Sequence, residues 1–310
     1  MTSRLSNDGF ERARAFVEAT GRPLDKALLA FNLGEGAAAP VINALVGYQN
    51  DDGGFGHGLE PDLATPASSA IATSVGLRCL SEVGAEGSHP MVRAALGWLE
   101  QTLEPDTGVW PIIPPEVELA PHAPWWSWSK DLAENWNGFR FNPSAELLAY
   151  LYRWRSVAPA AVVDAAEASL RRTLAEARII EGAYDLMCAA RLANAPGVPA
   201  DLRRSLIERV VRSELAHDAG DVHGSSLDLA PTPASPFAEP LAARIDPAID
   251  KLIAAQEPDG GWPLFWDWSF VDADAWAKAK GDWRGLLTRT AIQTLSAWRR
   301  VEERPPATAL

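Results

Sequence analysis

The chain has 310 residues, 47% of them hydrophobic, with a formal net charge of −13 and two cysteines. This acidity argues against nucleic acid as a partner, because nucleic-acid binding needs clustered Lys and Arg side chains. We find neither a signal-peptide pattern nor eighteen unbroken apolar residues, so we expect no membrane span. Both cysteines lie in apolar helical sequence, which is typical of reduced proteins, and we therefore expect a cytoplasmic protein.

Helical periodicity extends along the whole chain, and strand patterns are almost absent. Two kinds of helix alternate. One kind carries an apolar stripe on one side, as in 245–256, and the other is apolar or small nearly all round, as in 67–80. In chain order, the segments that we predict as helices are 8–20, 23–33, 38–49, 66–83, 88–103, 143–155, 160–179, 183–194, 199–216, 224–232, 239–256 and 285–302.

The alternation of these two kinds of helix predicts the architecture. A helix with little polar surface must be enclosed by others, so half-exposed and enclosed helices imply two concentric layers. About six outer–inner pairs would close into a ring that leaves no unpaired end. We therefore predict an all-α fold, an α/α toroid of helical hairpins, with residues 1–310 forming a single domain.

Helix start signals place several loops at one rim of this ring. Thr65-Pro66 and Asn142-Pro143 each suggest an N-cap followed by proline at the first helical position, opening an enclosed helix. The loops before them, and the segment 262–284, should gather where the inner helices begin. That rim presents the positive ends of the helix dipoles, and it collects His, Trp and acidic side chains.

A short motif recurs along the chain. Gln, then Asp-Gly-Gly, then an aromatic residue occupy 49–55 and again 256–262, and a degraded copy lies at 101–110. The glycines allow the positive-φ turn that reverses the chain between helices, and the Gln amide can satisfy backbone groups left free at helix ends. A motif that repeats within one chain indicates architecture rather than catalysis.

These repeats carry a family resemblance. The stretch 49–58, followed by Thr65-Pro66 and a helix of small residues, resembles a repeat of the protein prenyltransferase β subunits. The stretch 256–262 is similar to the Gln-Trp repeats of squalene–hopene and related triterpene cyclases. Both groups belong to the terpenoid cyclase/prenyltransferase superfamily of α/α toroids. The resemblance implies the toroid fold and an isoprenoid substrate, and it leaves open whether a partner subunit is needed.

The acid and metal motifs of that superfamily are not present here. The Asp-x-Asp-Asp acid of class II cyclases has Asp272-Ala-Asp274-Ala as its nearest counterpart, and no Asp-Asp-x-x-Asp string occurs. The prenyltransferase zinc site needs Asp, Cys and His, but Asp185 and Cys188 have no His obviously placed to join them. We therefore predict no metal and no cofactor, and we interpret Cys188 as a small core residue.

The best acid candidates directly follow the first repeat, in His57-Gly-Leu-Glu60-Pro-Asp62. Two carboxyl groups this close in a sheltered rim split their pKa values, which leaves one of them protonated as an acid. We predict Glu60 and Asp62 as catalytic residues and His57 as a substrate-binding residue. The alternative is that the two carboxylates cap a neighbouring helix.

Two tryptophan-rich segments supply the candidates for substrate binding. Tryptophan faces stabilise cations, including carbocations, and they also stack on sugar rings. Alternatively, these segments form a lid packed over the mouth of the toroid. The candidates are His122, Trp125, Trp126, Trp128, Arg140, Asn142, Trp266, Trp268, Asp272 and Trp276.

The leading functional prediction is a prenyltransferase- or terpene-cyclase-like enzyme that acts on an isoprenoid in a Trp-lined central cavity, assisted by Glu60 or Asp62 as acid. A carbohydrate-active toroid, either a glycoside hydrolase or a polysaccharide lyase acting on an oligosaccharide, would also use paired carboxylates and Trp platforms. A non-catalytic binding toroid is the third possibility. Fold does not choose among them.

Overall fold

The computed structural model describes residues 3–129, 139–176, 178–216 and 226–302. Within these ranges the regular structure is helical, and β pairing is limited to isolated bridges. None of the described helices is long and apolar enough to cross a membrane. The prediction of an all-α fold is confirmed.

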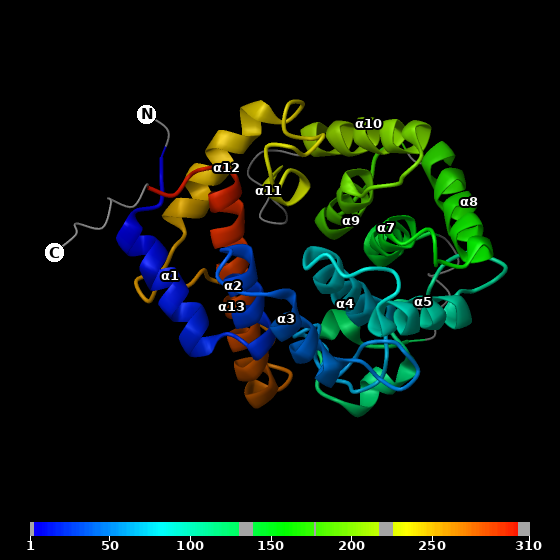
Figure 1. The fold of residues 1–310 in the computed structure, drawn as a ribbon, viewed down its shortest axis with the longest axis horizontal. Coiled ribbons are helices and arrows are strands. Elements are labelled where there is room, and N and C mark those ends of the chain that lie inside the picture. The colour runs from blue at the N-terminus through cyan, green and yellow to red at the C-terminus, as the bar shows by residue number, and fades with distance from the viewer. Residues whose placement is uncertain (1–2, 130–138, 177, 217–225, 303–310) are drawn as a thin grey trace.

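The helices form two layers, which Figure 1 shows as a ring within a ring. The outer helices are α1 (Asn7–Thr20), α3 (Ala38–Leu45), α5 (Pro90–Thr102), α8 (Ala160–Glu176), α10 (Ala200–Ala216) and α12 (Ala242–Ala254). The inner helices are α2 (Pro23–Asn32), α4 (Ala70–Glu82), α7 (Glu146–Arg153), α9 (Ala183–Asn194), α11 (Ser226–Leu229) and α13 (Ala273–Ala297). Short turns η1 (Val46–Tyr48), η2 (Pro115–Leu119), η3 (Pro124–Trp126) and η4 (Phe141–Ala145) lie between them.

The burial of each helix matches its layer. Inner helices α4 and α7 are buried on almost every side, whereas outer helix α10 buries only a stripe that includes Leu202, Leu206 and Val210. The ring closes where the two ends of the described chain meet. The Leu5 amide donates to the Arg300 carbonyl (2.7 Å), and the Glu302 amide donates to the Leu5 carbonyl (2.9 Å). The six outer–inner pairs among the described residues thus form the predicted α/α toroid.

The two complete repeats make equivalent contacts through their glutamines. Gln49 Nε2 donates to a carbonyl of its own turn (2.9 Å) and to the Met91 carbonyl in the first turn of α5 (3.0 Å). Gln256 Nε2 donates to a carbonyl of its own turn (3.0 Å) and to the Gly9 carbonyl in α1 (2.8 Å). Each glutamine therefore ties its turn to the next outer helix around the ring.

The aromatic residue of each repeat bonds to the inner helix that follows. The Phe55 amide donates to Thr73 Oγ1 (3.0 Å) on α4, and the Trp262 amide donates to Thr288 Oγ1 (3.1 Å) on α13. The two turns thus occupy equivalent hairpin corners, as the repeated motif predicts.

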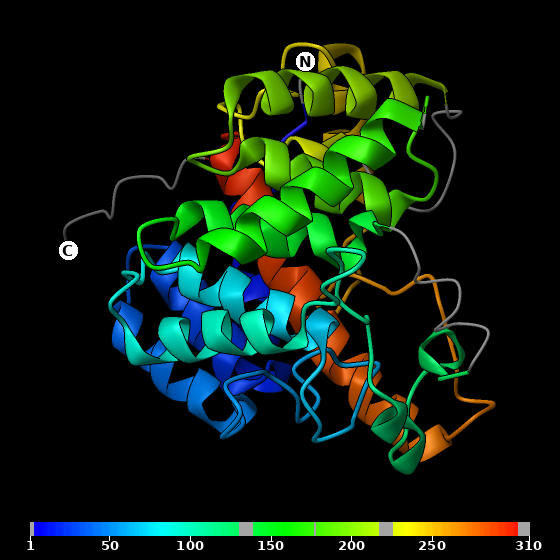
Figure 2. The ribbon, with the colours of Figure 1, turned by 90° about the vertical axis from the view of Figure 1, so that its right-hand side faces the viewer.

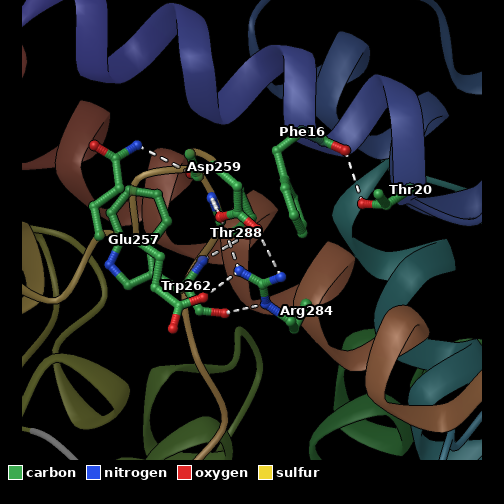
Figure 3. Close-up of polar contacts among 10 residues, drawn as sticks. Phe16, Thr20, Glu257, Asp259, Trp262, Arg284 and Thr288 are labelled. Carbon is green, nitrogen blue, oxygen red and sulfur yellow. Dashed lines mark hydrogen bonds and ion pairs between the residues drawn. The ribbon is translucent and has the colours of Figure 1, made fainter. Parts of the chain in front are cut away.

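The second turn is held by one further residue, Arg284 of α13, which Figure 3 shows in close-up. Its guanidinium bonds to the carboxylates of Glu257 (2.5 Å) and Asp259 (2.9 Å) and lies 4.6 Å from the centre of the Phe16 ring. The charge of Arg284 is therefore paired with carboxylates of the turn itself.

The starts of three inner helices differ from the sequence prediction. Helix α4 begins at Ala70, where Ser69 Oγ accepts from the Ala72 amide (3.2 Å); Thr65 Oγ1 accepts from the Ala67 amide within the preceding loop. Asn142 does not cap α7 either: the Asn142-Pro143 peptide is cis, and η4 intervenes before α7 begins.

Helix α13 begins well before the predicted position of 285. Asp272 caps it through a hydrogen bond from the Ala275 amide to Asp272 Oδ1 (2.9 Å). The run of alanines and lysines after this cap is rich in good helix formers, which explains why much of the predicted loop 262–284 is helical.

Candidate functional site

The loop that carries Glu60 and Asp62 is fixed on two sides. The Leu59 carbonyl accepts from Arg22 Nη1 (3.0 Å), and Arg22 Nε donates to Asp25 (2.8 Å). The Asp62 carbonyl accepts from the Ala123 amide (2.9 Å), which binds the loop to the chain beside η3. Glu60 and Asp62 are consequently held in place with 7% and 2% of their surface exposed.

Indole N–H groups converge on the Asp62 carboxylate. Trp268 Nε1 donates to Asp62 Oδ1 (2.7 Å). The indole N–H groups of Trp283 and Trp266 also face this carboxylate. Both nitrogen atoms are buried, and neither has another hydrogen-bond partner among the described residues. Burial raises the pKa of Asp62, and the indole donors partly oppose that rise by stabilising its charged form.

Glu60 is the more strongly perturbed carboxyl group. Burial, reinforced by the neighbouring charge of Asp62, raises the pKa of Glu60 to about 8, against the opposing charge of Arg78. A carboxyl group with this pKa is mostly protonated at neutral pH. Glu60 can therefore serve as a neutral acid beside Asp62.

The two tryptophan-rich segments meet beside Asp62 and form an indole cluster, which we define as Trp126, Trp266, Trp268, Trp276 and Trp283. Two of its contacts are Trp268 with Trp276 (ring centres 5.4 Å apart) and Trp266 with Trp283 (5.2 Å). Figure 2 shows the start of α13 and the segment containing η2 and η3 projecting at the same end of the ring. The loop folding thus brings together residues that are far apart in the sequence.

Tyr184, at the start of α9, lies within electrostatic reach of the same carboxyl pair. Burial, followed by the charges of Glu60 and Asp62, raises the pKa of Tyr184 to about 12. Its hydroxyl therefore remains protonated, while half of the side chain is exposed. Sequence reasoning did not identify this residue.

Several predicted substrate-binding residues lie outside the indole cluster. His57 is exposed, and its Nε2 lies 2.8 Å from Asn50 Oδ1. His122 Nδ1 lies 2.8 Å from the Ala120 carbonyl, within its own loop. Trp128 packs against a separate small apolar cluster, and Trp125 is 48% exposed.

The remaining predicted residues contact other parts of the inner layer. The Asn142 amide donates to Asp185 Oδ1 (2.9 Å), and the Asn142 side-chain oxygen lies 3.7 Å from Cys188 Sγ. Arg140 is exposed and lines an open surface pocket with Phe139, Phe141 and Asp185. Asp272 caps α13, as described above.

A buried ion cluster on three inner helices was not predicted. Glu146 of α7, with its side chain 2% exposed, accepts from Arg78 of α4 (3.3 Å), Arg191 of α9 (2.5 Å) and the Tyr150 hydroxyl (2.7 Å). Burial opposes the ionisation of Glu146, but the two arginines outweigh it and lower its pKa. Arg78, Glu146 and Arg191 each belong to a mainly apolar helix with only two charged residues, and this was the available sequence signal.

A second polar cluster centres on Glu82, at the C-terminal end of α4. Glu82 Oε1 accepts from Arg289 (3.0 Å), Asn32 (2.8 Å) and Gln293 (3.2 Å). Among the residues that the structure describes, no group of three or more His, Cys, Asp or Glu side chains is arranged to hold a metal ion.

The architecture has counterparts among solved structures. The chain is similar to a variant of the type II terpene cyclase MstE from Scytonema, in complex with its substrate geranylgeranyl dihydroxybenzoate: 19% identity, TM-score 0.55, covering 94% of this chain and 97% of that one. The chain has a terpenoid-cyclase-like fold. A protein from Actinoplanes matches similarly, with 18% identity and TM-score 0.53 over 94% of this chain and 98% of that one. No protein-family model and no curated protein matches the chain.

Proposed function

We propose that this protein is a terpene-cyclase-like enzyme in which Glu60 protonates an alkene of an isoprenoid substrate. The observation that supports this function is the buried pair of Glu60 and Asp62, which lies against the indole cluster in a ring similar to that of a type II terpene cyclase. The proposal includes a binding space at this rim, bounded by the indole cluster.

The proposed reaction begins with transfer of the Glu60 proton to one alkene carbon. The electron pair of the double bond forms the new C–H bond, and the other carbon becomes a carbocation. A second double bond of the chain then attacks this cation and closes a ring. The final cation loses a proton to solvent water, and the Glu60 carboxylate takes a proton from solvent, so substrate and product are isomers.

The two carboxyl groups have different roles in this scheme. A general acid works best when its pKa lies near the working pH, and Glu60 meets this condition. Asp62, held by the Trp268 indole, supplies the negative charge that stabilises the nearby carbocation. Indole faces add cation–π stabilisation of about 0.5–2 kcal/mol each.

The test is product formation by Glu60→Gln and Asp62→Asn, each compared with wild type. Farnesol, geranylgeraniol, squalene and a geranylgeranylated hydroxybenzoate are incubated with the protein, and products are identified by mass spectrometry. We expect cyclised isomers from wild type and a loss of at least about a hundredfold in rate for Glu60→Gln, with binding retained. Glu116→Gln, an exposed carboxylate on η2, is the matched control.

Equal rates for Glu60→Gln and wild type would contradict the assignment of the acid. Turnover of oligosaccharides, tested in parallel, would instead favour the carbohydrate-active alternative. Binding of an isoprenoid without any product from wild type would favour a non-catalytic toroid.

A further inference from the structure

The ion cluster of Arg78, Glu146 and Arg191 joins three helices of the inner layer. Its residues come from three successive inner helices, α4, α7 and α9, whose outer sides are covered by α5, α8 and α10. The Glu146 side chain is 2% exposed, whereas those of Arg78 and Arg191 are 31% and 28% exposed. Both arginine side chains are therefore partly exposed, although the helices that carry them are mostly buried.

This cluster carries an excess positive charge. Two guanidinium groups share one carboxylate, which leaves a net charge of +1. By contrast, Arg22 at the start of α2 pairs with Asp25, and Arg289 of α13 pairs with Glu82, which gives one carboxylate for each arginine. An unbalanced cation in the inner layer is notable in a chain whose net charge is −13.

The two arginines also keep hydrogen-bond donors unused. A guanidinium has five N–H donors. Arg78 bonds to Glu146 through Nη1 alone, and Arg191 uses Nη1 for Glu146 and Nη2 for Met187 Sδ. Nε and Nη2 of Arg78, and Nε of Arg191, have no other partner among the described residues, and none is a buried unsatisfied atom. These donors are accessible to a ligand.

We propose that Arg78 and Arg191 together bind a singly charged oxyanion, the carboxylate at one end of the isoprenoid substrate. A carboxylate matches the excess charge of +1 and the planar donor geometry of a guanidinium. A diphosphate carries more negative charge than this cluster balances. The isoprenoid nature of the ligand depends on the proposed function. The oxyanion site is inferred from the ion cluster alone.

The test measures binding of three ten-carbon probes by calorimetry: decanoate, decanol and decyl phosphate. None contains an alkene, so none can be cyclised, and the result does not depend on catalysis. We expect wild type to bind decanoate at least about tenfold more tightly than decanol, which corresponds to about 1.4 kcal/mol. We also expect decanoate to bind at least as tightly as decyl phosphate.

Two variants should change the affinity for decanoate in opposite directions. Arg191→Gln removes a donor and a charge, and should weaken decanoate binding about tenfold while leaving decanol binding unchanged. Glu146→Gln removes the competing carboxylate and should strengthen decanoate binding, which damage to the fold would not do. Arg171→Gln is the control, because it removes the same kind of ion-paired guanidinium from outer helix α8, where Arg171 pairs with Glu167 and Asp201.

Equal affinities of wild type for decanoate and decanol would overturn the proposal, and this comparison needs no variant. An equal loss of affinity for decanoate and for decanol in Arg191→Gln would also overturn the proposal. Tighter binding of decyl phosphate than of decanoate would show a phosphate site and contradict the carboxylate. Loss of cyclised product in Glu60→Gln tests the proposed function separately and does not affect these outcomes.

Discussion

Glu60 is a carboxyl group buried beside a second one, so its ionisation is coupled to folding. Its pKa is raised from 4.5 to about 8. The stabilising contribution of the neutral group is fully present below the unfolded pKa and is lost as pH rises through the folded pKa. Between about pH 5 and pH 9, wild type should lose a few kcal/mol of unfolding free energy relative to Glu60→Gln, at about 1.4 kcal/mol per pKa unit.

Urea unfolding at several pH values measures this difference. Glu116→Gln removes an exposed carboxylate from η2 and should follow wild type at every pH. If the curves for wild type and Glu60→Gln run parallel across this range, Glu60 is not buried in the manner described.

The hydrogen bond from Trp268 to Asp62 gives a second prediction at the scale of single residues. Its donor stabilises the ionised form of Asp62, and a hydrogen bond to a charged group contributes about 1.5–3 kcal/mol. Trp268→Phe should therefore lower the unfolding free energy more at alkaline pH, where Asp62 is ionised, than at acidic pH, where it is protonated.

Trp110→Phe is the control for this experiment. The Trp110 indole donates to the neutral Leu99 carbonyl (2.8 Å), so its removal should cost the same at both pH values. A pH-independent effect of Trp268→Phe would contradict the described interaction.

At the scale of secondary-structure elements, the repeat turns depend on glycine. Gly53 has φ of +94°, and a Cβ there would lie 2.3 Å from the Ala94 carbonyl oxygen of α5. Gly53→Ala should therefore lower the unfolding free energy by at least about 2 kcal/mol, because a left-handed residue with a Cβ and a backbone clash add together. Thermal and urea unfolding measure the loss.

Gly97 is the matched control. It lies within α5, and a Cβ there would meet nothing within 4 Å. Gly97→Ala should be stabilising by about 0.5–1 kcal/mol, since alanine favours the helix. Equal effects at the two positions would contradict the steric account of the turn.

Some elements of the fold are specified by neighbouring residues in the sequence, and others by distant contacts. The periodicity along each helix and the repeated turns depend on neighbouring residues, and they were sufficient to predict the layers and the toroid. The start of α4 depended on long-range contacts, because the loop before it is held by Arg22 and Ala123. A cap signal at Thr65 could not reveal those contacts.

The candidate site was likewise only partly predictable from the sequence. The position of Glu60 and Asp62 after the repeat drew attention to them, and the tryptophan-rich segments were visible as composition. Their convergence, and the meeting of Arg78 with Arg191 through Glu146, depends on how the inner helices are arranged around the ring. A single sequence carries no direct signal of that arrangement.

At the scale of the whole molecule, a toroid must join its last hairpin to its first. Gln256 makes this join, since it bonds to Gly9 across 247 positions of sequence, whereas Gln49 makes the equivalent bond to Met91 across only 42. Both glutamines donate through Nε2, and their hydrogen bonds have closely similar lengths. They therefore form a matched pair that differs mainly in the length of chain enclosed.

Gln49→Ala and Gln256→Ala should accordingly cost similar unfolding free energy, about 1–3 kcal/mol each, because each removes two hydrogen bonds to backbone carbonyls. Their kinetics should differ. Contacts between distant segments form late in folding, so Gln256→Ala should mainly accelerate unfolding, while Gln49→Ala should also slow folding. Stopped-flow folding and unfolding rates in urea measure this partition. If the lost free energy is divided between the folding and unfolding rates in the same way in both variants, the ring closes as early as its first hairpins form.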